Sequence, residues 1–142
     1  MSYPSTGTAM LAALNACLRA GLSGLVGTRV YTGLAPQGEG VYPRVVLHTL
    51  SGEDELTHAG GTVPQWSVQL SCQSRRLADC AAVRDAAKGL LHGFSGEMHG
   101  VYAGAVWYDG ESTAYADDQG IFILPVDFTV VLQPDWPEPP EE

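Results

Sequence analysis

The amino-acid sequence predicts an α+β domain in which an antiparallel sheet of about four strands carries two helices on one face. Two segments have leucines at helical spacing, and two others alternate apolar and polar residues as half-buried strands do. The segments follow one another as helix, strand, strand, helix, strand, strand. This order is typical of a sheet that is covered by helices on one side.

The first helix is predicted from Thr8 to about Leu25, because apolar side chains recur there every three or four residues. Its stripe consists of Leu11, Leu14, Leu18, Leu22 and Leu25. Ser5, Thr6 or Thr8 is available as the N-cap, and Gly27 marks the end of the helix.

Two strands joined by a long connection are predicted next. A very short extended piece, residues 28–33, precedes the first full strand, which runs from about Arg44 to Leu50 after a Pro- and Gly-rich loop. The acidic and then glycine-rich segment Ser51–Gln65 reads as a long, partly mobile hairpin connection. Trp66–Ser74, with the sequence WSVQLSCQS, is the second strand and pairs antiparallel with the first.

The second strand has one apolar and one polar side. Trp66, Val68, Leu70 and Cys72 fall on the side that we expect to face the core. The opposite side is a row of amides and hydroxyls: Gln65, Ser67, Gln69, Ser71 and Gln73.

A second helix is predicted from about Leu77 to His92, with Ser74 as its N-cap and Gly93 as its stop. Arg75 and Arg76 stand at its beginning, where the helix dipole favours acids. No local reason explains the two arginines, so we expect them to serve a contact.

The last two strands are predicted at Val101–Asp109 and Phe122–Leu132. Because Pro125 has no N–H to donate, the final strand is expected to lie at a sheet edge or to carry a bulge there. Residues 1–133 form the single predicted domain. Residues 134–142 are an acidic, Pro-rich tail that we expect to be extended or disordered.

Charge and cysteine content limit the function classes. The 142 residues include 16 acidic and 7 basic side chains, a formal net charge of −9, which disfavours binding of nucleic acid through its phosphates. The 3 cysteines form no C-x-x-C pair, and no export signal or membrane-length apolar run is visible. These features predict folding in a reducing cytoplasm without a membrane anchor.

No catalytic, cofactor-binding or metal-binding pattern stands out. Ser23 lacks the nucleophile-elbow spacing. Cys72 paired with His48 across neighbouring strands is the one candidate for a small hydrolase, although core packing is the simpler role for Cys72. The histidine spacings fit no zinc motif, and the acids of residues 52–55 and 117–118 lack the order of a calcium loop.

The chain resembles the tail terminator, or tail completion, proteins of long-tailed bacteriophages and gene transfer agents. The resemblance rests on VGTRVYTGLAPQG after the first helix, YPRVV, the WSVQLSCQS strand, the helix ending in LHGFSG, and DDQGIFILPVDFTV. It covers about Thr8 to Leu132 and leaves out the tail. It implies a structural virion protein at the head–tail junction, assembled in the host cytoplasm, with no catalytic residues.

The resemblance also implies partners. Such proteins form a hexameric ring that stops tail-tube polymerisation and joins the tube to the head connector, or stopper, while DNA passes through the bore. We expect the amide row to contact a neighbouring subunit or the channel. The candidates for an acidic lumen or for docking to a basic partner are Glu53, Asp54, Glu55, Asp117 and Asp118.

Three alternatives remain open from sequence. A head–tail joining or minor tail protein of similar size would share the acidic, non-catalytic character. A hydrolase would use Cys72 and His48. A stand-alone soluble binding domain would be monomeric.

Overall fold

The computed structural model describes residues 6–35, 40–56 and 62–133, with backbone alone for 51–56 and 62–63. It has three helices: α1 (Gly7–Gly21), α2 (Ser23–Val26) and α3 (Leu77–Leu91). Its strands are β1 (Val30–Thr32), β2 (Arg44–Leu56), β3 (Thr62–Ser74), β4 (Gly96–Met98), β5 (Val101–Glu111), β6 (Tyr115–Ala116) and β7 (Phe122–Leu132).

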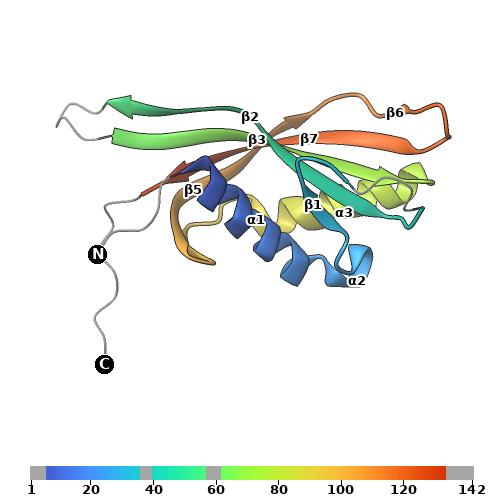
Figure 1. Ribbon diagram of the computed structural model, residues 1–142, viewed down its shortest axis with the longest axis horizontal. Coiled ribbons are helices and arrows are strands. Elements are labelled where there is room, and N and C mark those ends of the chain that lie inside the picture. The colour runs from blue at the N-terminus through green and yellow to red at the C-terminus, as the bar shows by residue number, and fades with distance from the viewer. Residues whose placement is uncertain (1–5, 36–39, 57–61, 134–142) are drawn as a thin grey trace.

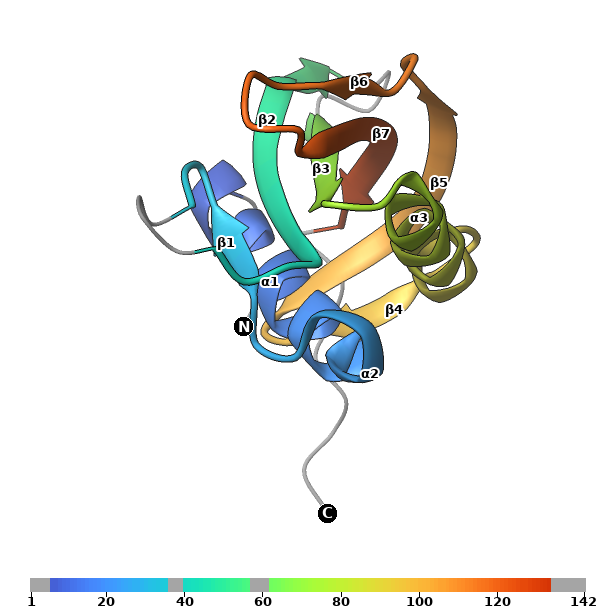
Figure 2. The same ribbon diagram turned by 90° about the vertical axis from the view of Figure 1, so that its right-hand side faces the viewer.

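The strands form one 7-stranded sheet in the order β1-β2-β3-β7-β5-β4, with β6 paired to β7. All described pairs are antiparallel except β1 with β2, which are parallel. The sheet curls around the helices, and α1 and α3 pack on the same side of it (Figures 1 and 2). The α+β class with helices on one face is confirmed. The estimate of about four antiparallel strands is too low, because β1, β4 and β6 are too short to show alternation.

The core lies between this concave side of the sheet and the two long helices. Leu14 and Leu18 of α1, Leu91 of α3, and Leu70 and Phe128 of the sheet are all at most 1% exposed. Burying each such side chain contributes roughly 1.5–3 kcal/mol before chain entropy is counted. Val68 and Cys72 are buried as predicted, and Trp66 is half-buried at the edge of the same cluster.

Thr6, one of the three predicted N-cap candidates, caps α1, since its side chain accepts a hydrogen bond from the Ala9 N–H at 3.1 Å. The helix boundaries differ from the predicted ones at two other points. The helix ends at Gly21, and α2 follows as a separate turn. Ser74 is not the N-cap of α3; that position is Arg76, whose N–H donates to the Ser74 hydroxyl at 3.4 Å.

The predicted hairpin connection is mostly strand, which corrects the sequence interpretation. The β2–β3 ladder continues from Glu53 opposite Gln65 to Leu56 opposite Thr62, with a register shift between Thr49 and Ser51. Figure 1 shows this hairpin reaching past the helices. No helix packs on this part of the hairpin. Its sequence therefore lacks the alternation of apolar and polar residues from which a strand is predicted. Only residues 57–61 lie between the strands, outside the described part of the chain.

The expectation that Pro125 marks an edge strand or a bulge in β7 is wrong. Strand β7 lies between β3 and β5, and its pairing with β3 runs without a shift from Gln65–Val131 to Ser74–Phe122. The Pro125 carbonyl accepts from the Ser112 N–H at 3.0 Å, so its nitrogen points to the interval between β5 and β6. The missing donor therefore interrupts no ladder.

Candidate functional site

The amide row lies on the face of the sheet that the helices leave uncovered, here called the open face. Val68, Leu70 and Cys72 are fully buried on the helix side, so the alternate residues of β3 point the other way. The row consists of Gln65, Ser67, Gln69, Ser71 and Gln73. Its members are half-buried except Ser71, which is 7% exposed. The row is thus a densely packed polar surface and not a set of free side chains.

Hydrogen bonds tie the row to the neighbouring strands. Arg44 on β2 donates through Nε to Oε1 of Gln73 at 2.8 Å, and Nε2 of Gln73 donates to the Ser71 hydroxyl at 3.0 Å. On the other side, Nε2 of Gln69 donates to Oδ1 of Asp127 at 3.0 Å. These bonds hold the amides in fixed orientations, which lowers the entropy that a docking partner must remove.

Two further strands extend the polar surface. Thr129 of β7 donates to the Asp109 carboxylate of β5, and Thr129 pairs with Ser67 across the β3–β7 ladder. Sequence reasoning missed Asp109, Asp127 and Thr129 as members of this surface. The alternation along the last strand could have predicted that Asp127 and Thr129 lie on the open face. The position of Asp109 could not be predicted in this way, because it depends on a register shift between Tyr108 and Gly110.

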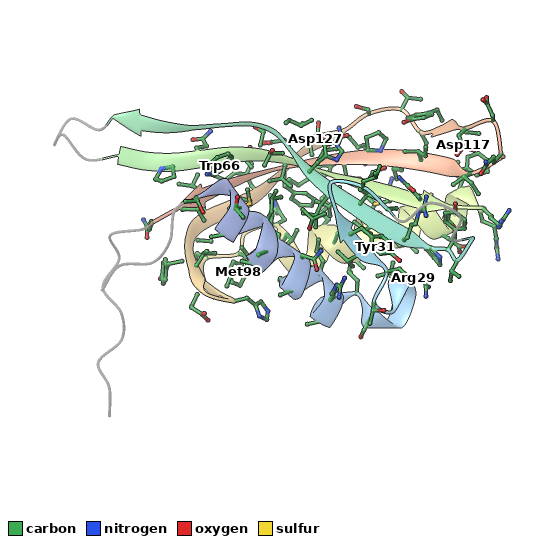
Figure 3. All side chains as sticks on the ribbon, viewed as in Figure 1. Arg29, Tyr31, Trp66, Met98, Asp117 and Asp127 are labelled. Carbon is green, nitrogen blue, oxygen red and sulfur yellow. The ribbon has the colours of Figure 1, made fainter. Side chains whose placement is uncertain are left out.

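The candidate acids lie at opposite ends of the molecule. Glu53, Asp54 and Glu55 belong to the projecting end of β2. Asp117 and Asp118 belong to the turn between β6 and β7. Figure 3 labels Asp117 at the other end of the molecule. The two ends are separated by the β3 segment from Gln65 to Ser74, roughly 30 Å of strand.

Asp117 has a structural task of its own. Its Oδ1 accepts from the N–H groups of Gln119 at 2.8 Å and Ile121 at 3.0 Å. Gly120 completes the turn with a φ of 78°, a conformation that favours glycine. Asp118 is exposed, so it is the acid at this turn that remains available to a partner.

Cys72 and His48 do not form a pair. Cys72 is opposite Val45 and His48 is opposite Gln69, which places the thiol on the helix side and the imidazole on the open face. Burial also raises the pKa of the Cys72 thiol to about 12, so the nucleophilic thiolate is suppressed at neutral pH. The Cys–His hydrolase is therefore excluded by geometry.

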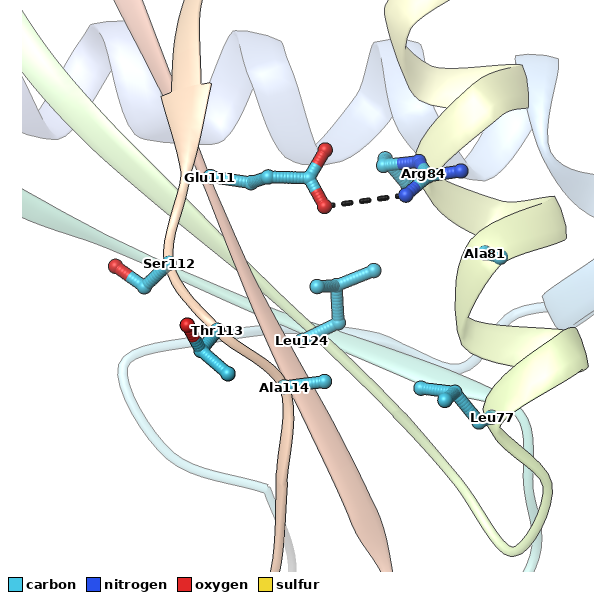
Figure 4. A pocket seen from close by; sticks show the side chains of 8 residues that line it. All are labelled: Leu77, Ala81, Arg84, Glu111, Ser112, Thr113, Ala114 and Leu124. Carbon is cyan, nitrogen blue, oxygen red and sulfur yellow. Dashed lines mark hydrogen bonds and ion pairs between the residues drawn. The ribbon is translucent and has the colours of Figure 1, made fainter.

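An open pocket of about 420 Å³ lies between α3 and the segment after β5 (Figure 4). Leu77, Ala81 and Leu124 provide its apolar wall. Arg84 pairs with Glu111 across it at 3.1 Å. The Tyr108 hydroxyl donates to the same Glu111 carboxylate at 2.8 Å, and this bond raises the pKa of the tyrosine.

The pocket offers no activated nucleophile, since its hydroxyls, Ser112 and Thr113, have no histidine beside them among its lining residues. Over the described ranges, no group of 3 His, Cys, Asp or Glu side chains is arranged to hold a metal ion. None of the helices in those ranges is long and apolar enough to cross a membrane.

Comparison with known proteins finds likeness in structure and not in sequence. No protein-family model matches the chain, and no curated protein sequence matches it. A chain from a solved structure described as the virion of a native gene transfer agent particle matches with a TM-score of 0.63 and 20% sequence identity. The match covers 87% of this chain and 97% of that chain, so the two share a fold over nearly their whole lengths.

Proposed function

We propose that this protein is a structural subunit of a phage-like virion, and specifically its tail terminator. The observation that carries the proposal is the fold shared with a chain of a gene transfer agent virion, which extends over 97% of that chain. The motifs from VGTRVYTGLAPQG to DDQGIFILPVDFTV, in their order and spacing, support the finer assignment.

In this proposal the subunits form a hexameric ring on the head-proximal end of the tail tube. A closed ring requires each subunit to offer two different surfaces to its neighbours. The open face suits one of them, because the amides of Gln69 and Gln73 already have partners within the subunit. Covering hydrogen-bonded amides costs less free energy than covering unpaired charges.

The ring would end tube growth and present a surface to the head connector, while DNA passes through the bore without specific binding. Carboxylates lining the bore would repel the phosphates. The two groups of acids are assigned to different surfaces, because roughly 30 Å of strand separates them. One group, at the hairpin end, is Glu53, Asp54 and Glu55, and the other, at the turn, is Asp117 and Asp118. One set is proposed for the lumen and the other for a basic partner.

Tail length after deletion of the gene tests the proposal. Electron microscopy should show overlong tubes, because nothing then stops polymerisation. Tails of normal length beside unjoined heads would instead assign the protein to head–tail joining. Normal, joined particles would refute a virion role at this junction.

A further inference from the structure

An arginine cluster lies at the end of the sheet where β2 begins and β3 ends. It consists of Tyr42, Arg44, Arg75 and Arg76. The Arg44 guanidinium lies 4.7 Å and the Arg75 guanidinium 5.4 Å from the centre of the Tyr42 ring, within the range of cation–π contact. Arg75 and Arg76 are exposed. The cluster thus presents 3 of the 7 basic side chains of a chain whose net charge is −9.

The cluster has no acidic partner among the residues that the structure describes. Both ion pairs in those ranges belong to Arg84, with Asp85 and Glu111. The Nε–H of Arg44 donates a hydrogen bond to the neutral side-chain amide of Gln73 and not to a carboxylate. Asp79, the acid in the first turn of α3, takes its hydrogen bond from Ser74 at 3.3 Å.

Because Arg44 and Arg75 contact the same Tyr42 ring, their positive charges repel one another, and an anion bound beside them lowers the free energy of the assembly. Arg76 is also the N-cap residue of the 15-residue helix α3, whose positive dipole end adds to the same field. Glu39, in the preceding loop, lies outside the described residues, and one carboxylate there would leave the cluster positive. The site therefore fits a ligand with several carboxylates.

We propose that the arginine cluster of one subunit binds the acidic tail, residues 134–142, of a second copy of this chain. The tail PDWPEPPEE contains four acids, four prolines and Trp136. Its carboxylates match the guanidiniums in sign, and an indole stacks readily on a guanidinium plane. Prolines restrict the unbound chain, so less entropy is lost when such a segment is immobilised.

Geometry makes a second copy the source of the tail. Phe122, at the start of β7, pairs with Ser74 beside the cluster, whereas Leu132 lies at the far end of the same strand, roughly 33 Å away. The ten residues from Gln133 to Glu142 would span only about 31 Å in an extended polyproline conformation, so Asp135 and Glu138 could not reach the cluster of their own chain. The tail of a second copy, by contrast, could bring all four acids to the cluster. The proposal rests on the proposed function, because this contact would join successive subunits of the ring.

Peptide binding tests the inference. The probe is a fluorescein-labelled peptide with the sequence of residues 134–142. The protein is the full chain with its own tail neutralised by Asp135→Asn, Glu138→Gln, Glu141→Gln and Glu142→Gln. Fluorescence anisotropy should show saturable binding that weakens as salt rises. The double substitution Arg44→Gln/Arg75→Gln should weaken it by about tenfold or more.

The matched control is Arg84→Gln/Lys88→Gln, which removes the same charge from α3 and should leave the affinity unchanged. A peptide with amides in place of its carboxylates should not bind. Thermal melts verify folding, and Arg75→Gln alone, at an exposed position, serves if the double variant is unstable.

Absence of binding at millimolar peptide, or equal binding by the cluster variant and its control, would overturn the inference. So would cluster-dependent binding of a DNA duplex in place of the peptide. The assay needs no particle, so overlong tails after gene deletion combined with no peptide binding would retain the proposed function and reject this contact alone.

Discussion

Cys72 lies in the core with none of its surface exposed, and burial raises the pKa of its thiol to about 12. At pH 8 only about one such thiol in ten thousand is ionised. We therefore expect iodoacetamide to modify the half-buried Cys17 before Cys72 in the native protein, as measured by mass spectrometry of peptides. Rapid alkylation of Cys72 would contradict the assigned core position.

The same shift links Cys72 to stability at high pH. The unfolded thiol ionises near its ordinary pKa of 9.0, whereas the folded thiol stays protonated until about pH 12. Its contribution to stability is therefore complete below pH 9 and is lost as pH rises from about 9 to 12. Cys72→Ala should reduce the steepness of this loss in urea unfolding measured across the same range.

Pro125 gives a second test at the residue scale. Because its nitrogen faces the interval between β5 and β6, Pro125→Ala should change the free energy of unfolding by less than about 1 kcal/mol. The neighbouring Val126→Pro should destabilise by about 3 kcal/mol or more, since the N–H of Val126 points to β3. Chemical denaturation of both variants measures the difference, and equal losses would show that the strand assignment is wrong.

Which residues share a face could be predicted, because period-two alternation follows from backbone geometry alone. That rule placed Gln69 and Cys72 on opposite sides. It did not identify Asp109, whose contact with Thr129 depends on an irregularity in the β5–β7 register. The prediction for Pro125 was wrong because β7 can accommodate a proline at this position only where β5 has already ended. The end of β5 cannot be read from the sequence of β7.

At the scale of elements, the β6–β7 turn depends on Asp117. Asp117→Ala removes both hydrogen bonds from its carboxylate to backbone N–H groups and should destabilise the protein by about 1–2 kcal/mol. Asp118→Ala is the matched control and should have almost no effect on a thermal melt. If the two variants melt alike, the carboxylate of Asp117 does not support the turn.

The two long strands show where prediction of elements fails. The helices around Leu14 and Leu91 are visible in sequence because they bury one stripe of side chains. The outer half of the β2–β3 hairpin covers no helix, so its acidic sequence looked like a connection. Strand β1 pairs in parallel with β2 through only three residues, Val30–Thr32, which is too few for a pattern.

At the scale of the molecule, the open face is the proposed neighbour contact. Gln69→Trp should leave the fold intact, because no helix covers this face, yet should give overlong or unjoined tails when it replaces the native protein in particles. Ala82→Trp, on the exposed side of α3, is the matched control and should support normal tails. Normal particles with Gln69→Trp would show that the open face is exposed to solvent and does not contact a neighbouring subunit.

The α+β class with helices on one side of the sheet followed from the order of the elements. The curl of the sheet and the separation of the acids did not, because both arise from pairing between residues distant in sequence. Asp118 and Glu53 are alike in charge, yet the structure puts them at opposite ends.

A three-dimensional map of the intact particle tests the central claim most directly. The account predicts a hexameric ring of this fold between the tail tube and the head connector, with carboxylates rather than arginines lining its bore. A particle without this chain, or with the chain elsewhere than at that junction, would contradict the terminator assignment. A bore lined mainly by Lys and Arg would contradict the acidic lumen.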